Sequence, residues 1–199
     1  DEAITKGLEF FKPKTQEMIN KINSFSKPVV VYCWRGGMRS KAVVLLFESN
    51  VYQLRGGHKA YRKYVREKLH NFETKFSFVV LCGMTGAGKT KMLKKFDNSL
   101  DLEGLANHRG SLFGGVGKVK RSQKMFEALL LNELERLNKF KVVLVEGESR
   151  KIGNLIIPEK LFKKMRNSPK VFLDVPIDER VKNIVGEYFD DVNALKEIT

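Results

Sequence analysis

The feature that most constrains the fold of this chain is the loop Gly83-Met84-Thr85-Gly86-Ala87-Gly88-Lys89-Thr90, which matches the pattern G-x-x-x-x-G-K-[ST] at every fixed position. The apolar run 76–82 before it is typical of a buried strand. Residues 89–96 after it predict a helix with Leu93 and Phe96 on one side. Glycines in such a loop let successive N–H groups face one phosphate, and the helix N-terminus adds partial positive charge. The sequence therefore predicts a phosphate or diphosphate site.

Two further cations are expected to join this site. Arg109 lies in the stretch 101–114, which is too long and too rich in glycine for a simple connector. Arg150 follows the strand predicted at 141–146, at the strand end where open α/β sheets bind ligands, although a structural salt bridge is the alternative for it. The predicted phosphate-binding residues are Gly83, Thr85, Gly86, Ala87, Gly88, Lys89, Thr90, Arg109 and Arg150.

The strand 141–146 ends in an acidic residue, as the second motif of phosphate-loop proteins does. Glu146 or Glu148 is therefore a candidate ligand for Mg²⁺ or for a water molecule. Magnesium at Glu146 is a possible cofactor, and no tightly bound cofactor is expected.

Net charge points to a polyanionic partner. The 199 residues carry a formal charge of +14 with a pI near 9.8, and the excess is spread along the chain rather than confined to a tail. Such a balance favours nucleic-acid binding, and a merely soluble lysine-rich protein is the alternative. Two cysteines are too few for a disulfide framework, which predicts a reducing cytoplasm. No apolar run reaches the length of a membrane span, so no membrane partner is expected.

A second loop carries nucleophilic chemistry. Pro13 is expected to open a helix that ends before Lys27-Pro28, and residues 29–32 predict a buried strand. The loop Cys33-Trp34-Arg35-Gly36-Gly37-Met38-Arg39-Ser40 then leads into a helix, where backbone N–H groups and two arginines favour a thiolate. A buried structural thiol is the alternative. The predicted catalytic residues are Cys33, Arg35 and Arg39.

This loop resembles the active-site loop of the rhodanese family of sulfurtransferases, in which the cysteine carries a persulfide or perselenide. A strand at 51–54, then Arg55-Gly56-Gly57 and a helix from His58, is similar to the end of a rhodanese domain. The resemblance implies a partial rhodanese-like α/β domain at residues 1–72. A P-loop NTPase-like domain at residues 73–199 follows, and its alternating strands and helices predict a parallel sheet with helices on both faces.

The two loops together resemble the tRNA 2-selenouridine synthase family. The resemblance spans nearly the whole chain and includes the stretches DLEGLANHRGS at 101–111 and EGESR at 146–150. It implies the replacement of sulfur by selenium in wobble 2-thiouridine of tRNA, with selenophosphate as donor. It also implies an S-geranylated intermediate made from geranyl diphosphate, which is the second co-substrate.

The resemblance names partners as well. It implies tRNA as substrate, and selenophosphate synthase as the source of the donor. Residues 1–32 supply fewer strands than a rhodanese domain begins with, and the chain opens with Asp1. We therefore expect an incomplete chain: an internal fragment, a split version with a partner chain supplying the missing part, or a degenerate form. The basic helix from His58 to about His70 is either a solvated face or a contact for the RNA backbone.

Two other functions remain open at this stage. One is a P-loop small-molecule kinase or ATPase with a vestigial rhodanese region. The other is a non-catalytic tRNA-binding subunit of a split enzyme.

Overall fold

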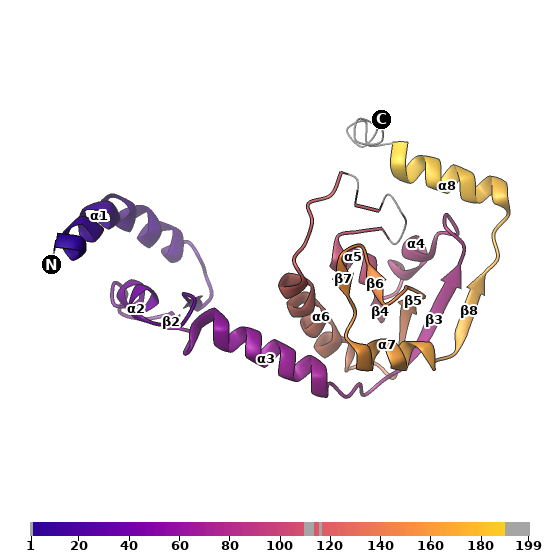
Figure 1. Cartoon of the computed structure of the whole chain (residues 1–199), viewed down its shortest axis with the longest axis horizontal. Coiled ribbons are helices and arrows are strands. Elements are labelled where there is room, and N and C mark those ends of the chain that lie inside the picture. The colour runs from indigo at the N-terminus through magenta and orange to yellow at the C-terminus, as the bar shows by residue number, and fades with distance from the viewer. Residues whose placement is uncertain (1, 110–113, 116, 190–199) are drawn as a thin grey trace. The chain divides into compact units, whose positions relative to one another are not determined.

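The computed structural model describes residues 2–109, 114–115 and 117–189. The chain forms two compact units, Asp1–Tyr64 and Val65–Thr199 (Figure 1). The division falls inside helix α3 (Gly57–Asn71), whereas the sequence placed the domain boundary at the end of that helix. One continuous helix therefore contributes residues to both units.

The first unit is built on a small parallel sheet. Its elements are α1 (Glu2–Asn23), β1 (Val29–Val31), α2 (Met38–Val44), β2 (Val51–Gln53) and the start of α3. Strands β1 and β2 pair in parallel, with Val30 opposite Tyr52. The loop that contains Cys33 leaves the carboxyl end of β1 and enters α2, as the sequence predicts.

Helix α1 corrects one expectation. It begins at Glu2 and contains Pro13 in its interior, whereas the sequence predicted that Pro13 opens the helix. A proline inside a helix removes one hydrogen bond and costs about 3 kcal/mol, so the remaining turns must support it. The sequence interpretation found no clear period in residues 1–12, although Ile4, Leu8 and Phe11 recur there at helical spacing.

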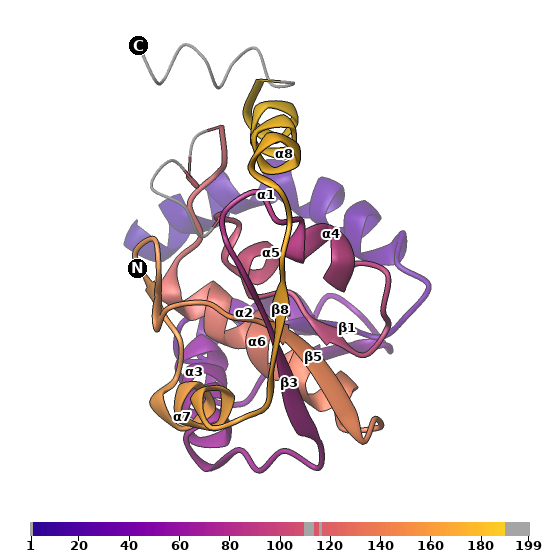
Figure 2. The same cartoon turned by 90° about the vertical axis from the view of Figure 1, so that its right-hand side faces the viewer.

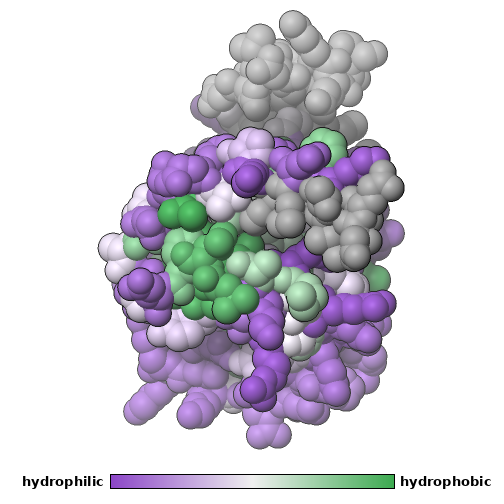
Figure 3. All heavy atoms as spheres, turned by 90° about the vertical axis from the view of Figure 1, so that its left-hand side faces the viewer, coloured by the Kyte–Doolittle hydropathy of each residue, from purple (hydrophilic) through white to green (hydrophobic). Residues whose placement is uncertain are grey.

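The first unit has little interior. Among the residues whose burial the structure describes, it contains no fully buried apolar side chain, and its buried polar side chain is Ser40. Large apolar side chains are exposed instead: Phe25, Val30, Met38, Leu45 and Leu46. Figure 3 shows a hydrophobic patch on the face that it draws. Monomeric proteins seldom expose large apolar patches, so this unit has the surface of an interaction site.

The second unit is an α/β domain around a four-stranded parallel sheet (Figure 2). Its strands follow the order β4-β5-β3-β8, with β3 and β5 in the middle. The elements are β3 (Ser77–Gly83), α4 (Lys89–Leu93), β4 (Ser99–Leu100), α5 (Leu102–Ala106), α6 (Gln123–Leu137), β5 (Val142–Glu146), β6 (Lys151–Ile152), β7 (Leu155–Ile156), α7 (Glu159–Arg166), β8 (Lys170–Leu173) and α8 (Ile177–Phe189). The predicted parallel α/β architecture of this part of the chain is confirmed.

Apolar side chains of the central strands and of α6 make the core of this unit. Phe78, Val143 and Val145 are at most 1% exposed, and Phe126 and Leu130 of α6 are fully buried. Burying one such side chain contributes roughly 1.5–3 kcal/mol. Helices α4 and α7 pack against β3. The core therefore fixes the strand that leads into the phosphate loop.

Four short elements were not predicted. Strand β4 lies just before the stretch 101–114 that the sequence assigned to an irregular loop, and helix α5 lies inside it. Strands β6 and β7 form an antiparallel hairpin after Arg150. Strands of two residues give no measurable alternation of apolar and polar side chains. The side chain of Asp101 caps α5 by accepting a hydrogen bond from the Gly104 N–H. That N-cap was the available signal for α5.

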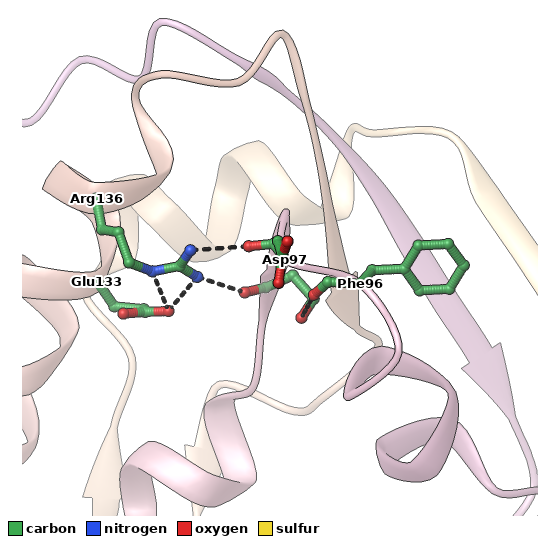
Figure 4. Close-up of polar contacts among 5 residues, drawn as sticks. Phe96, Asp97, Glu133 and Arg136 are labelled. Carbon is green, nitrogen blue, oxygen red and sulfur yellow. Dashed lines mark hydrogen bonds and ion pairs between the residues drawn. The ribbon is translucent and has the colours of Figure 1, made fainter.

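An arginine of α6 ties the connection between α4 and β4 to the domain. Figure 4 shows the Arg136 guanidinium directed at Glu133 and at the chain beside Asp97. It donates to the Asp97 carbonyl at 2.8 Å and to a Glu133 carboxylate oxygen at 2.5 and 2.9 Å. The contact holds the chain segment that leads into α5.

No helix in the described part of the chain combines the length and apolarity needed to cross a bilayer.

Candidate functional site

The phosphate loop connects the end of β3 to the start of α4, as predicted. Gly86 and Gly88 have φ angles of +80° and +78°, in the left-handed region that glycine adopts at low cost. The Lys89 ammonium donates to the Gly83 carbonyl at 2.9 Å and so lies over the loop. These features bring the glycines, the lysine and the Thr90 hydroxyl of the predicted site together.

Helix α8 holds the outer side of this loop. Arg180 Nε donates to the Thr85 carbonyl at 3.0 Å, and Asn183 Nδ2 donates to the Gly86 carbonyl at 2.9 Å. A Cβ on Gly86 would lie 2.5 Å from the Arg180 carbonyl, so only glycine lets the helix approach this closely. The contacts of Arg180 and Asn183 could not be predicted from the sequence. These polar residues lie nearly a hundred positions beyond the loop, on a helix that the sequence pattern does not distinguish from one exposed to solvent.

Three carboxylates gather beside the loop. Glu103, Glu146 and Glu148 each offer an oxygen within 4.8 Å of the others. Glu146 lies opposite Leu81 at the end of the neighbouring strand and is fully buried. Its Oε1 accepts the backbone N–H of Glu103 at 2.6 Å. The Thr90 hydroxyl donates to Glu103 at 3.1 Å, which links the acidic cluster to the phosphate loop.

Burial and mutual repulsion keep protons on this cluster. Burial, followed by the negative charge of Glu103, raises the pKa of Glu146 to about 9. Burial and the same neighbour raise the pKa of Glu148 to about 7, while the charge of Lys89 opposes the shift. The cluster is therefore partly protonated near neutral pH.

The cluster also fits a hard divalent cation. Glu146 Oε2 has no hydrogen-bond partner although it is buried, and an orphaned carboxylate oxygen inside a protein is costly. Carboxylate oxygens are the ligands that Mg²⁺ prefers. The sequence pointed to Glu146 or Glu148 but missed Glu103, which α5 supplies and which the capping residue Asp101 helps to position.

The other predicted phosphate ligands lie on neighbouring loops. The Arg109 N–H donates to the Gly114 carbonyl, and a Cβ on Gly153 would lie 2.7 Å from the ring of His108. The hairpin therefore packs on the segment before Arg109. Arg150 lies 3.9 Å from Glu159, which is the salt bridge left open as the alternative, so its phosphate role stays a prediction. Gly110 and Ser111, the last residues of the 101–111 stretch, lie outside the described residues.

The Cys33 thiol has donors around it. The N–H of Gly37 lies 3.2 Å from Sγ, and the Ser40 hydroxyl lies 3.3 Å from it. Gln53 of β2 donates to Ser40 Oγ at 2.8 Å and to the Gly36 carbonyl at 2.7 Å, so the second strand holds the loop that surrounds the thiol.

These donors make Cys33 acidic. The Ser40 hydroxyl, followed by backbone N–H groups of Ser40, Gly37 and Arg35, lowers the pKa of Cys33 from 9.0 to about 6 against the opposing effect of desolvation. Most of the thiol is therefore ionised at neutral pH, as a nucleophile requires. The predicted arginines differ in their part: Arg35 contributes through its backbone, while both the Arg35 and Arg39 side chains are exposed.

The start of α3 closes the Cys33 loop from the other side. The N–H of His58 donates to the Cys33 carbonyl at 2.9 Å, and that of Lys59 donates to the Trp34 carbonyl at 3.0 Å. A Cβ on Gly57 would lie 2.1 Å from the Cys33 carbonyl oxygen, and its φ is +61°. Glycine is therefore required at position 57 if the helix is to meet the loop.

Comparison with known proteins identifies the family. The family model for the tRNA 2-selenouridine synthase AAA domain matches residues 76–197. The chain is 35% identical to the tRNA 2-selenouridine synthase of Hydrogenovibrio crunogenus, over 100% of this chain and 59% of that protein. It is 39% identical to that of Pseudomonas syringae pv. syringae, over 94% of this chain and 50% of the relative. For Aeromonas salmonicida the identity is 40%, over 82% of this chain and 45% of the relative.

These matches cover most of this chain but only part of each relative. The chain thus spans about half the length of the curated relatives it matches. The matched segments include both the Cys33 loop and the phosphate loop in the first of them, which covers the whole chain. On these grounds the chain belongs to the tRNA 2-selenouridine synthase family.

Proposed function

We propose that this chain supplies the thiolate loop and the phosphate-binding domain of an enzyme that replaces sulfur by selenium in wobble 2-thiouridine of tRNA. The observation that carries the proposal is the Cys33 thiol with the Gly37 N–H and the Ser40 hydroxyl 3.2 and 3.3 Å from its sulfur, in a chain whose relatives are named for this product. The formal charge of +14 suits a polyanionic substrate. Work on this substrate belongs to the cytoplasm, where tRNA is modified.

The phosphate loop in this proposal holds a donor rather than a nucleotide. Selenophosphate and the diphosphate of geranyl diphosphate both present oxygens that the loop N–H groups and Lys89 bind. Geranylation of the 2-thio sulfur turns it into a better leaving group, which eases attack by a selenium nucleophile at C2 of the base. Selenophosphate synthase is then the source of the selenium donor.

Cys33 takes part in the displacement. A perselenide formed directly from selenophosphate would need an oxidant, because its selenium and the thiolate sulfur are both fully reduced. We therefore assign Cys33 to the exchange at C2 and not to carriage of oxidised selenium. In this assignment the loop N–H groups, with Arg35 and Arg39, stabilise the negative charge of the Cys33 thiolate.

Magnesium has a defined place in the proposal. Glu146, with Glu103 and Glu148, would hold the ion beside Thr90. When bound, Mg²⁺ supplies positive charge that neutralises phosphoryl oxygens. Of the three glutamates, Glu146 is fully buried, while Glu103 and Glu148 are half-buried beside it.

The experiment that tests this function is reconstitution. Thiolated tRNA, geranyl diphosphate and selenophosphate are incubated with the protein, and the nucleosides are analysed by mass spectrometry. Cys33→Ser is expected to abolish selenium incorporation while tRNA binding, measured by filter retention, survives. Normal selenium incorporation by Cys33→Ser would show that the assigned role is wrong.

The exposed apolar surface of the first unit favours a partner chain in this enzyme. Val30 and Tyr52, which face each other across the small sheet, are more than half exposed. A chain that supplies the rest of a rhodanese-like sheet would cover them. The reconstitution is therefore run with and without the remaining part of a full-length relative, and activity that appears only with it supports this arrangement.

The alternatives are separated by the same materials. Hydrolysis of ATP that disappears in Lys89→Ala would indicate a P-loop kinase or ATPase instead. A complex that keeps every activity with Cys33→Ser would indicate a non-catalytic tRNA-binding subunit.

A further inference from the structure

Four aromatic rings gather next to the Cys33 loop. Tyr32 and Trp34, which flank the cysteine in the sequence, both stack on His58 of α3, with centroids 6.0 and 5.4 Å away and interplanar angles of 24° and 28°. Tyr61, one turn further along α3, lies 6.4 Å from the same imidazole. The thiol chemistry described above does not use these rings.

The array is fixed by the backbone and open to solvent. The Trp34 carbonyl accepts the N–H of Lys59, and the Cys33 carbonyl accepts that of His58, so both sides of the stack are anchored to one helix start. Yet Trp34 is 49% exposed and Tyr32 is 57% exposed. An ordered ring that keeps half of its surface in water loses little conformational entropy when a flat ligand covers it.

The surroundings of the array are cationic. Arg35 and Arg39 of the Cys33 loop and Lys59 of α3 are exposed. α3 continues with further basic residues and bears no acidic residue in its first turn. Exposed aromatic faces among arginines and lysines are the arrangement by which proteins bind single-stranded nucleic acid, since the rings stack on bases and the cations contact phosphates.

We propose that Trp34, supported by Tyr32 and His58, is a stacking platform for an unpaired base of an RNA loop. This inference rests on the proposed function. It adds a site that presents the RNA substrate to the Cys33 loop. The ligand class is an unpaired base in a single-stranded segment, held by its face and not by base-specific hydrogen bonds. Arg35, Arg39 and Lys59 contact the flanking phosphates.

The chain provides a direct probe, because Trp34 is its only tryptophan. The protein is titrated with a short single-stranded RNA that contains uridine, and with a matched RNA that has an abasic site at that position. Uridine avoids energy transfer to a thiolated base. We expect the uridine RNA to quench Trp34 emission and the abasic RNA to leave it nearly unchanged. Trp34→Ala should weaken binding, measured by fluorescence anisotropy of labelled RNA, about tenfold or more.

Matched variants separate stacking from folding. Tyr52→Ala removes an aromatic ring of similar exposure, 55%, that lies outside the array, and should leave RNA affinity unchanged. Trp34→Phe should keep part of the affinity, whereas Trp34→Leu keeps apolar bulk without a π face and should not. Far-UV circular dichroism verifies that each variant is folded.

The inference is overturned by wild-type affinity in both Trp34→Ala and Trp34→Leu, by equal quenching with the abasic RNA, or by an absence of RNA binding. Its failure is distinct from that of the proposed function. Selenium incorporation that is lost in Cys33→Ser but unchanged in Trp34→Ala removes the platform and leaves the enzyme assignment in place.

Discussion

The two loops of this protein differ in what supports them. Each leaves the carboxyl end of a parallel strand, and each meets a helix through a glycine that has no room for a side chain, Gly57 or Gly86. The phosphate loop rests on a four-stranded sheet with a core of fully buried side chains. The Cys33 loop rests on two strands whose described neighbours include no buried apolar side chain. A few hydrogen bonds, led by that of the Ser40 hydroxyl, thus suffice to lower the pKa of a thiol without a packed core beneath it.

The largest expected effect tests that difference directly. Phe126→Ala in the second unit should lower the free energy of unfolding by about 3–5 kcal/mol, because it removes a fully buried ring. Leu45→Ala in the first unit, where the side chain is 74% exposed, should change it by less than about 0.5 kcal/mol. Urea unfolding followed by circular dichroism measures both. Equal losses would mean that the first unit also has a core.

A second pair of substitutions asks whether the loops fail independently. Gly86→Ala puts a side chain at φ +80° against the Arg180 carbonyl and should weaken pyrophosphate binding about tenfold or more by calorimetry. The cysteine loop should still react with iodoacetamide at its normal rate. Gly186→Ala is the matched control on α8, because no heavy atom lies within 4 Å of the added carbon, and it should bind pyrophosphate normally.

The converse substitution is made in the first unit. Gly57→Ala should slow alkylation of Cys33, because its Cβ would displace the Cys33 carbonyl, and should leave pyrophosphate binding intact. Gly37→Ala, with no heavy atom within 4 Å of the added carbon, is its control. Loss of both activities from either single change would show that the two sites depend on one another.

The buried acid Glu146 gives the stability of the second unit a pH dependence. Glu146 has a folded-state pKa of about 9, above the 4.5 of an ordinary carboxyl, so the folded protein binds the extra proton. Stability contributed by this group therefore falls as the pH rises from about 4.5 to about 9, with a slope of at most about 1.4 kcal/mol per pH unit.

Glu146→Gln mimics the protonated acid. It should flatten the slope of the free energy of unfolding against pH, measured by unfolding with a chelator present. Glu135→Gln on the surface of α6 should leave it unchanged. A slope that is identical in Glu146→Gln would exclude Glu146 as its source.

The smallest effect concerns the thiol itself. Because the Cys33 pKa is lowered to about 6, its alkylation rate should rise with pH through about 6 and then level off. Ser40→Ala removes the leading cause of the shift and should move this midpoint upward. Cys33→Ser identifies the reacting thiol by abolishing the fast phase. An unmoved midpoint in Ser40→Ala would leave the backbone N–H groups as the cause.

The sequence predicted the features that depend on neighbours along the chain. The phosphate loop, the strand before it and the strand ending at Glu146 follow from short patterns. The sequence missed Glu103, Arg180 and Asn183, because these reach the loop only through tertiary packing. The sequence of a helix does not indicate which carbonyl group one of its polar side chains will contact in the folded protein.

The same limit applies to the Cys33 site. The acidic thiol was predicted from the glycines and arginines around it, yet its leading donor is the Ser40 hydroxyl, which Gln53 of the second strand in turn contacts. The interior proline of α1 was missed for a different reason. Ile4, Leu8 and Phe11 recur at helical spacing before Pro13, but proline is so common at the first turn of a helix that Pro13 was taken as its start.

The hydrogen bonds from α8 to the phosphate loop make the two thermodynamically linked. If the helix favours the conformation of the loop that accepts phosphate, a bound phosphate must stabilise the helix by the same free energy. Occupancy of the loop should therefore slow the exchange of α8 backbone amides with solvent deuterium, on a timescale of seconds to hours. Through Arg180 and Asn183, the state of the donor site is thus transmitted to a helix that also carries exposed Ile177, Val181 and Val185.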